Sequence, residues 1–466
     1  MQNTSIIAVC LYIILLLIIG IFASKKNTSS SNYILGNRSL GYWVTAISAN
    51  ASDMSVWLFM GLPMSIYRSD LLSIWMPVGL ILFMFLNWQI IAKPLRVQSE
   101  ALGALTLSSF IEKKIAPNKK TLRILLALSS VFFLTIYISA GIIGMGYLFE
   151  QLFSLNYYTG CIVSIFAILI YISIGGFSAI CYTDFIQGLF LLFIIIIVPS
   201  IIIYDYFYLN TLTLASNNSI NFQDFIPKNA PDAGKVLLLV FSWGLGYFGQ
   251  PHILSKFMAI KDAQELNKAK WIGTIWQILA LSASIATGLA AHLFFTEVPA
   301  NPEMIFVIMA KAIFPSFLAA FALCAILAAT LSTIDSQIIV AASVISQDFY
   351  CLLNKKASDK KILLVSRVSA IFICLIALSI ALFKNNSIHD AVYYCWSGLG
   401  SSFGPLLIAT LYGRKLNYNY CVAALIVCVS IGIFWNFFNT GIPTLIPGFL
   451  LGFLIIFIGS KVKSEN

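Results

Sequence analysis

Long apolar runs separated by short polar segments fill most of the chain. Each is long enough to cross a bilayer, which takes about 20 residues, and the runs lie at residues 4–23, 41–65, 70–92, 123–149, 156–175, 183–207, 233–255, 268–295, 304–347, 363–383, 390–412, 418–437 and 443–461. In the ninth run, Pro315 predicts a break between a short re-entrant or surface piece and one long helix. The pattern predicts an all-α polytopic membrane protein with about 13 transmembrane helices.

Polar residues interrupt the second run. Its segment SANASDMSVWLFMGLP, residues 48–63, places Asp53 and several small polar side chains at membrane depth. A carboxylate there is costly, and it usually faces a cavity and meets a cation or a polar partner. Small polar neighbours favour a locally opened helix, whose free carbonyl groups can act as ligands. We therefore favour an ion and solute site. The alternative is that Asp53 pairs with a Lys or Arg and only holds helices together.

The seventh run carries a second interruption, FSWGLGYFGQP at residues 241–251. Glycine and proline in a span also serve close helix packing, which is the alternative interpretation. Two interrupted spans five apart nevertheless indicate an inverted repeat of five plus five helices. We expect one domain, 1–466, with an extra helix at 4–23, repeats at 41–207 and 233–412, and two further helices at 418–461. The aromatic residues Trp243, Tyr247 and Phe248 could wall an apolar pocket.

A third polar segment lies in the ninth run. Ala329, Ser332 and Thr333 are spaced i, i+3, i+4, so that one helix face presents two hydroxyl groups and a carbonyl group. Together with carbonyl groups of an opened helix near Ala51 and Met54, they would form an oxygen cage for a small hard cation. Ser and Thr side chains in spans often bond only to carbonyl groups of their own helix. That alternative would explain Ser332 and Thr333 by themselves, but the presence of Asp53 favours the oxygen cage.

Composition and charge agree with the membrane assignment. The chain is 60% hydrophobic and 10% charged, with a mean hydropathy of +0.92, whereas soluble domains have about 25% charged residues. Of the 28 Lys and Arg residues, 23 fall on one side if the N-terminus is outside, including Lys25, Lys26, Lys256, Arg414, Lys415 and Lys463. This asymmetry predicts an outside N-terminus and a cytoplasmic C-terminus. It also explains the net charge of +10 without a nucleic-acid partner.

Several classes of chemistry find no support in the sequence. The nine cysteines are scattered, the three histidines have no metal-ligand spacing, and no nucleotide-binding motif is present. An ion gradient is therefore the expected energy source, and we do not expect an enzyme. Outside the spans, we expect a surface loop at 210–235 and an apolar piece, 104–111, along the cytoplasmic membrane surface.

Five motifs carry a family resemblance over nearly the whole chain. They are LGNRSLGYW, SANASDMSVWLFMGLP, FLTIYISAG, WGLGYFGQPHILSKFMA and LSTIDSQ, and with them the chain resembles the sodium/solute symporters. The long WGLGYFGQPHIL motif resembles the proline carriers of that family. The resemblance implies a LeuT-type fold and cotransport of L-proline with Na⁺ across a bacterial cytoplasmic (inner) membrane, with the lipid bilayer around it and no obligate protein partner.

The resemblance also implies site residues. Na⁺ would bind the carbonyl groups of Ala51, Met54 and Ala329 and the hydroxyl groups of Ser332 and Thr333, with Asp53 required for Na⁺ affinity directly or through its field. The proline site would be bounded by Ser55, Trp57, Tyr137, Trp243, Tyr247 and Pro251. Arg38 matches a cytoplasmic residue that affects Na⁺ coupling, although it could equally be an ordinary basic anchor.

Two further acids suggest a second cation or proton site. Asp184 opens the sixth span, and Asp335 lies three residues after Ser332 with Ser336 beside it. Some members of the family hold a second Na⁺ between these regions. The hypothesis is a site made of Asp184, Ser332, Asp335 and Ser336. The alternative is a capped or hydrated acid near the cytoplasmic exit.

Three functions compete at this point. The first is Na⁺-coupled uptake of proline, and the second is Na⁺ symport of another small solute, such as a betaine, another amino acid or a monocarboxylate. The third is a membrane sensor that binds a ligand without transport. A sensor normally needs an attached signalling domain, and the sequence ends soon after the last predicted span.

Overall fold

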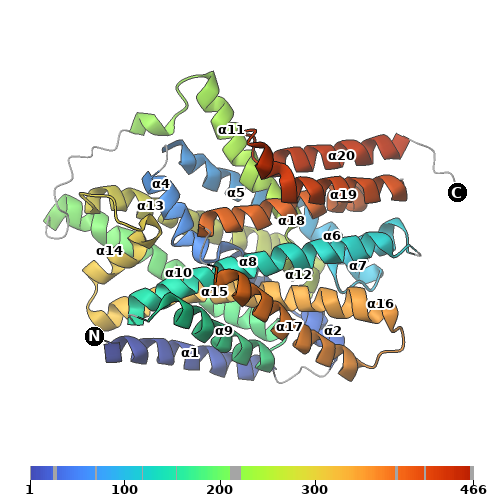
Figure 1. Ribbon diagram of the computed structural model, residues 1–466, viewed down its shortest axis with the longest axis horizontal. Helices are drawn as coiled ribbons and strands as arrows, with labels where there is room; N and C mark the ends of the chain where they lie inside the picture. Colours follow the sequence, from blue (N-terminus) through green and yellow to red (C-terminus); the bar gives the residue numbers. More distant parts are fainter. Residues whose placement is uncertain are drawn as a thin grey trace.

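The computed structural model describes residues 2–24, 29–68, 71–117, 119–153, 155–209, 222–383, 387–413 and 416–461. Within these ranges the chain is helical, and the extended pairing consists of one isolated bridge between Leu40 and Ile260. Most long helices run along the longest axis of the molecule, so that α1 starts at one end and α20 finishes at the other (Figure 1). Several parts of the predictions lie outside the described residues, namely Lys25, Lys26, Lys384, Arg414, Lys415, Lys463 and residues 210–221 of the predicted loop.

The unbroken long helices match the predicted spans closely. They are α1 (Gln2–Ser24), α5 (Trp75–Leu86), α8 (Thr121–Phe153), α9 (Tyr157–Ile174), α10 (Phe177–Tyr204), α13 (Leu266–Phe294), α15 (Ser316–Val344), α17 (Asp359–Ala381), α18 (Ile388–Tyr412), α19 (Tyr418–Phe434) and α20 (Leu445–Lys461). A π-helical turn, Asn87–Ala92, continues α5 into α6 (Lys93–Ala101), and another, Ile345–Tyr350, continues α15 into α16 (Cys351–Leu353).

Shorter helices complete the chain between the spans. They are α2 (Ser30–Leu35), α7 (Leu107–Ile115) and α14 (Ile305–Ile313). The predicted break at Pro315 is confirmed, because α14 ends before this residue and α15 begins directly after it. The apolar piece predicted at 104–111 forms helix α7, which starts and ends later because Thr106 caps its N-terminus by accepting a hydrogen bond from the Ser109 N–H group.

Both predicted interruptions of helices are present. The first broken helix consists of α3 (Tyr42–Met54), the 3₁₀ turn η2 (Val56–Leu58) and α4 (Gly61–Arg68). Ser55 stands at the break with φ +45° and ψ −170°, a conformation that few residues other than glycine adopt, so the α-helix cannot continue through it. Ser55 Oγ caps the turn that follows by accepting a hydrogen bond from the Trp57 N–H group.

The second broken helix consists of α11 (Ala230–Gly244), the 3₁₀ turn η7 (Leu245–Gly249) and α12 (Pro251–Ala259). Gln250 is extended between the two halves, and Pro251 starts α12, where its missing N–H group costs no hydrogen bond. Close packing accompanies this break as well. A Cβ atom at Gly246 would lie 2.0 Å from Nε1 of Trp396, and one at Gly249 would lie 2.5 Å from the Leu399 carbonyl oxygen.

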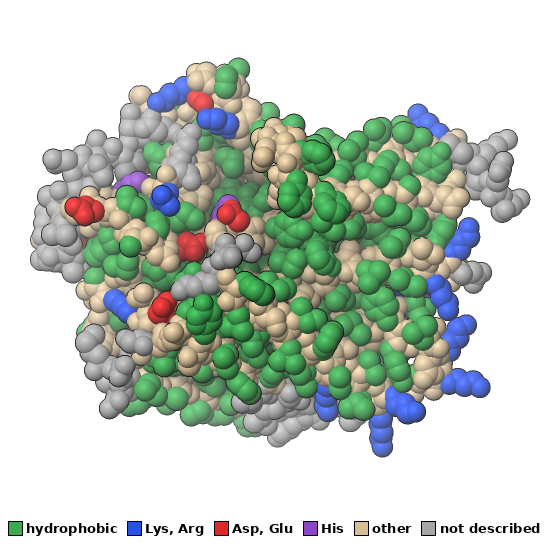
Figure 2. All heavy atoms as spheres, in the orientation of Figure 1, with side chains coloured by type: hydrophobic (Ala, Val, Ile, Leu, Met, Phe, Trp, Pro, Cys, Tyr) green, Lys and Arg blue, Asp and Glu red, His purple; other side chains and the backbone are tan. Residues whose placement is uncertain are grey.

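The surface is that of a protein surrounded by lipid. Seven of the described helices are long and apolar enough to cross a membrane, and three shorter helices are also apolar. Hydrophobic side chains cover the band between the two ends of the molecule, and most Lys and Arg side chains on the visible face lie at the end where α20 finishes (Figure 2). The chain is therefore a multi-pass membrane protein.

Candidate functional site

The five residues predicted to bind Na⁺ lie together between the first broken helix and α15, and we call them the oxygen cluster: Ala51, Met54, Ala329, Ser332 and Thr333. Each is at most 1% exposed. The Ser332 hydroxyl group donates to the carbonyl oxygens of Ala51 at 3.0 Å and Ala329 at 3.1 Å. Thr333 Oγ1 lies 3.0 Å from the Ala329 oxygen and accepts a hydrogen bond from the Ser55 N–H group, also at 3.0 Å.

The break in the helix explains why carbonyl groups are available in the oxygen cluster. Met54 is the last residue of α3, and the final four carbonyl groups of a helix lack partners within it. The oxygens of the cluster are uncharged, and they come from two helices that no covalent link holds at a fixed distance. Such neutral oxygens, including carbonyl groups at unwound helix ends, are ligands for a hard monovalent cation.

Beside the oxygen cluster lies a small cavity, which we call the central cavity. Its lining combines aromatic and aliphatic side chains with one carboxylate: Asp53, Met54, Trp57, Leu80, Tyr137, Trp243, Tyr247, Val392 and Trp396. The rings of Trp57 and Trp243 lie 5.1 Å apart, and the ring of Tyr247 meets Trp396 edge-on at 5.0 Å. A small solute with an apolar face and few polar groups fits such walls.

Asp53 belongs to the central cavity. Its Oδ2 atom accepts a hydrogen bond from the Tyr247 hydroxyl group at 2.5 Å, and that hydroxyl group accepts one from Gln277 Nε2 at 2.8 Å. Asp53 is 7% exposed, and its hydrogen-bond partner is this neutral hydroxyl group. Among the described residues Asp53 has no ion-pair partner, so the structure does not support the alternative interpretation of Asp53 as half of an ion pair.

The structure brings together four of the six residues predicted for the solute site. Trp57, Tyr137, Trp243 and Tyr247 line the central cavity, and Ser55 lies next to it at the break of the helix. Pro251 lines another cavity, described below, and Phe248 packs against the rings of Phe83 and Phe449. The sequence did not reveal further members of the site, namely Leu80, Val392, Trp396 and Gln277, because only the packing of α5, α13 and α18 brings them there.

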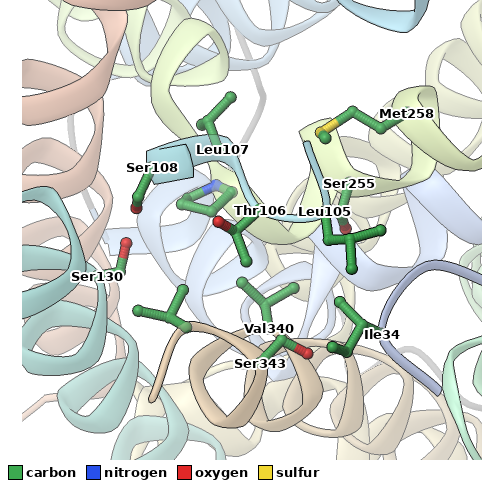
Figure 3. A pocket seen from close by; sticks show the side chains of 12 residues that line it. Ile34, Leu105, Thr106, Leu107, Ser108, Ser130, Ser255, Met258, Val340 and Ser343 are labelled. Atoms are coloured by element: carbon green, nitrogen blue, oxygen red, sulfur yellow. The ribbon is translucent and has the colours of Figure 1, made fainter. Parts of the chain in front are cut away.

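Two other cavities are lined in part by residues of the second broken helix. One has lining residues within 239–243, 389–393 and 435–443 and shares Trp243 with the central cavity. The other is lined by Pro251 and Ser255 of α12 and by side chains of α7 and α15 (Figure 3). Trp243 thus contributes to the walls of two cavities.

Arg38 holds three segments together. Its guanidinium group donates to the Met258 carbonyl oxygen at 2.5 Å, to that of Ala104 at 2.8 Å and to the Ser99 hydroxyl group at 3.1 Å. The backbone at Asn37 and Arg38 is left-handed, with φ +50° and +54°. These contacts exceed what an ordinary basic anchor at the membrane surface needs, and the effect of Arg38 on Na⁺ coupling stays a prediction.

The predicted second cation site contains a lysine. Lys256 was counted as a residue of a cytoplasmic segment, but it is fully buried in the last turn of α12, and that count was wrong for this side chain. Its Nζ atom lies 2.9 Å from Asp184 Oδ2 and donates to the Ser336 hydroxyl group at 2.9 Å. Ser48 of α3 donates to the same carboxylate oxygen at 3.2 Å.

The other two residues of that hypothesis lie beside the lysine without contacting it directly. Asp335 is 1% exposed and precedes Ser336 on α15. Ser332, one turn earlier, bonds to Ala51 and Ala329 and belongs to the oxygen cluster. We call the group around the lysine the Lys256 cluster: Ser48, Cys181, Asp184, Lys256, Asp335 and Ser336. The sequence had suggested Asp184, Asp335 and Ser336, whereas the contributions of Ser48, Cys181 and Lys256 gave no signal there.

Similar proteins agree with this architecture. An osmoregulated proline transporter of Bacillus subtilis is 37% identical over 477 residues, which cover 99% of this chain and 95% of that protein. A sodium/proline symporter of Staphylococcus saprophyticus is 35% identical over 98% of this chain and 93% of its own length.

The fold has a solved counterpart as well. The substrate-bound, outward-open structure of a Na⁺-coupled sialic acid symporter superimposes with a TM-score of 0.81 at 16% identity, covering 98% of this chain and 97% of that one. At this identity the likeness shows the fold alone. The family model described as "Sodium:solute symporter family" matches residues 33–428. The chain therefore belongs to the sodium:solute symporter family.

Proposed function

We propose that this protein carries L-proline into the cell together with Na⁺ by alternating access. The observation that carries the proposal is the contiguity of two sites. The oxygen cluster and the central cavity share Met54 and lie on the two sides of one broken helix. The names of the two proline-transporting relatives support proline as the solute.

In this proposal Na⁺ binds the carbonyl groups of Ala51, Met54 and Ala329 and the hydroxyl groups of Ser332 and Thr333. The hydrogen bonds that join Ala51, Ala329, Ser332 and Thr333 support this assignment, and Met54 ends the helix segment that carries Ala51. Asp53 acts on Na⁺ through its field from the neighbouring cavity, because its carboxylate accepts a hydrogen bond from the Tyr247 hydroxyl group there.

Proline occupies the central cavity. Its ring packs between Trp57, Trp243 and Tyr247, and Tyr137 and Trp396 close the walls. The carboxylate of proline is placed at the opened segment after Ser55, where N–H groups at the start of the next helical turn lack partners in the helix. Pro251 acts at a distance, because it fixes the start of α12.

Coupling follows from the shared helix. Na⁺ orders the segment from Ala51 to Ser55, and the same segment forms one wall of the proline site. Each ligand then raises the affinity for the other by the same factor, a coupling of typically about 1–3 kcal/mol. An inward-directed membrane potential adds about 2.3 kcal/mol per charge per 100 mV. The chain needs no covalent chemistry for this work, and we assign it no enzymatic activity.

We further propose thirteen spans with the N-terminus outside and the C-terminus in the cytoplasm. The basic end of the molecule, where α20 finishes, is then the cytoplasmic end, in agreement with the positive-inside rule (Figure 2). Residues 41–207 and 233–412 form the two halves of a LeuT-type inverted repeat, within one domain of residues 1–466, and 4–23 and 418–461 flank them. The two broken helices support this assignment because each comes first in its half.

Uptake of radiolabelled L-proline into proteoliposomes tests the proposal, with and without an inward Na⁺ gradient. We expect gradient-dependent uptake by the native chain and at least a tenfold loss in Asp53→Asn. Glu297→Gln serves as the matched control, because this acid is exposed after the end of α13, and it should transport normally. Uptake that ignores Na⁺ would contradict the coupling. Binding of another small solute in place of proline would contradict the assignment of proline as the substrate. The assignment of the oxygen cluster as the Na⁺ site would stand.

A further inference from the structure

Lys256 is buried in a way that lysine side chains seldom are. It lies in the middle of the protein with no exposed area, and the carboxyl group that it contacts is equally buried. A buried charge is destabilising by several kcal/mol unless a partner of opposite charge and further hydrogen bonds compensate it. The contacts around Lys256 must therefore supply this compensation, and they define the place that the ammonium group fills.

The surroundings of the ammonium group resemble the ligand set of a metal ion. Its three N–H bonds have three acceptors, namely Asp184 Oδ2 and Ser336 Oγ, both at 2.9 Å, and Cys181 Sγ at 3.3 Å. The face of the Phe177 ring lies 5.0 Å from Nζ. Ligands from α10 and α15 thus converge on one positive charge that the chain itself delivers from α12.

The Lys256 cluster contains more acceptor oxygens than one ammonium group can bond. Asp184 Oδ1 and both carboxylate oxygens of Asp335 are buried, and within the described part of the chain they have no side-chain hydrogen-bond partner. Asp335 is also close enough to interact electrostatically with Lys256 and Asp184. Removal of the ammonium group would leave buried acidic and hydroxyl oxygens without a compensating positive charge. Such a group of oxygens would strongly attract a cation.

The position is connected to the oxygen cluster. Ser336 lies four residues after Ser332, so the two hydroxyl groups lie one turn apart on one face of α15. Ser48, which donates to Asp184, lies one turn before Ala51 on α3. Two places for a positive charge therefore follow one another along the interface of α3 and α15.

We propose that Lys256 is a tethered cation, which permanently fills a second cation position between α10 and α15, and that Na⁺ can enter this position once the ammonium group is removed. The proposal rests on the proposed function, since it takes the oxygen cluster as the site of the one transported Na⁺. The exchange of one monovalent cation for another conserves the charge around Asp184 and Asp335.

The test is equilibrium binding of radiolabelled Na⁺ to the purified full-length protein in detergent, with the number of bound ions per chain as the readout. We expect one Na⁺ for the native chain and for Lys256→Arg, and two for Lys256→Met. The double variant Asp184→Asn/Lys256→Met should return to one, because the acid that attracts the second ion is gone. Lys270→Met is the matched control, since Lys270 is also largely buried but donates to the neutral Gln89 side chain, and it should bind one.

Thermal unfolding of the same proteins provides a second readout. NaCl, compared with choline chloride, should raise the unfolding temperature of Lys256→Met by more than that of the native chain, because Na⁺ stabilises only the folded state that binds it. The tethered-cation proposal would be overturned if Lys256→Met bound one Na⁺ per chain and NaCl raised its unfolding temperature no more than that of the native chain. The proposed symport function would stand. A Lys256→Met chain that fails to fold in any concentration of NaCl, while Lys256→Arg folds, would overturn the tethered-cation proposal too. No Na⁺ binding to the native chain would instead overturn the proposed function.

Discussion

The oxygen cluster and the Lys256 cluster occupy the same helix interface, one turn apart, but they have opposite electrical character. The oxygen cluster consists of backbone carbonyl and hydroxyl oxygens, which are neutral and bonded to one another. The Lys256 cluster contains two carboxyl groups and an ammonium group at hydrogen-bond distance from one of them. Neutral oxygens can hold an ion and lose it again, whereas a buried pair of opposite charges stays together because separating it is costly.

This difference explains why one interface can serve both for exchange and for stability. An ion that must leave in each transport cycle needs ligands that are stable without it. Hydrogen bonds from the Ser332 and Thr333 hydroxyl groups to backbone carbonyl oxygens satisfy this condition. A permanent charge pair needs no such tolerance, and it ties α12 to α10 and α15. Variants that remove one group from either cluster therefore test whether the Lys256 cluster mainly sets stability and the oxygen cluster mainly sets Na⁺ affinity.

The largest effect is expected when the charge pair is broken on the acidic side. Asp184→Asn leaves the buried Lys256 ammonium group without its paired carboxylate, which should cost about 3–5 kcal/mol of stability. Thermal unfolding in detergent measures the loss, and added Na⁺ should not recover it because the acid is absent. The double variant with Lys256→Met should regain most of the stability. Full stability in Asp184→Asn alone would show that the pair does not hold these helices.

A smaller effect is expected in the oxygen cluster, and on ion affinity more than on folding. Thr333→Ala removes one ligand of the proposed Na⁺ site and the acceptor of the Ser55 N–H group. A loss of about 1–3 kcal/mol corresponds to a rise of roughly 5- to 150-fold in the Na⁺ concentration for half-maximal uptake. Thr333→Ser should largely restore affinity.

Thr330→Ala is the control for that experiment. Thr330 lies on the same helix and is equally buried, but its hydroxyl group bonds only to the Ile326 carbonyl oxygen of its own helix. Its removal should leave the Na⁺ dependence unchanged. An equal loss of Na⁺ affinity in Thr330→Ala and Thr333→Ala would show that helix packing, and no specific ligand, sets the affinity.

The smallest effect is expected at Ser336. Ser336→Ala removes one of three acceptors around the ammonium group, while Asp184 and Cys181 remain. The stability should fall by about 1 kcal/mol, the net value of one hydrogen bond, and the number of bound Na⁺ ions should stay the same. Ser343→Ala, whose hydroxyl group bonds to its own helix at the Ile339 carbonyl oxygen, is the matched control. A change in ion number in Ser336→Ala would mean that Ser336 belongs to the exchanging site.

The sequence predicted those parts of the site that interrupt an apolar pattern. Ser55 breaks the second span because the polar run around Asp53 disfavours a continuous helix, and Pro251 marks the start of α12. The spacing of Ala329, Ser332 and Thr333 on one helix face also predicted the oxygen cluster correctly as a group.

The parts that the sequence did not predict depend on how helices pack. Leu80 lies on α5, which is apolar all round, and Val392 and Trp396 lie on α18, which mixes polar and apolar residues. Neither pattern shows which side of the helix faces a cavity. Lys256 lies near the end of a predicted span, where lysine is normally a surface residue, so the positive-inside count included it. Only the crossing of α10, α12 and α15 shows that this lysine meets Asp184.

The buried lysine also sets an upper limit on how steeply the protein can accumulate its solute. One mobile Na⁺ moving through a potential of 100 mV supplies about 2.3 kcal/mol, enough for a concentration ratio of roughly 50-fold before the Na⁺ gradient itself is added. A second mobile ion would square this ratio to about 2,500-fold and would double the number of ions that enter with each solute molecule. By keeping one positive charge fixed to α12, the chain gives up the steeper gradient and takes in less sodium.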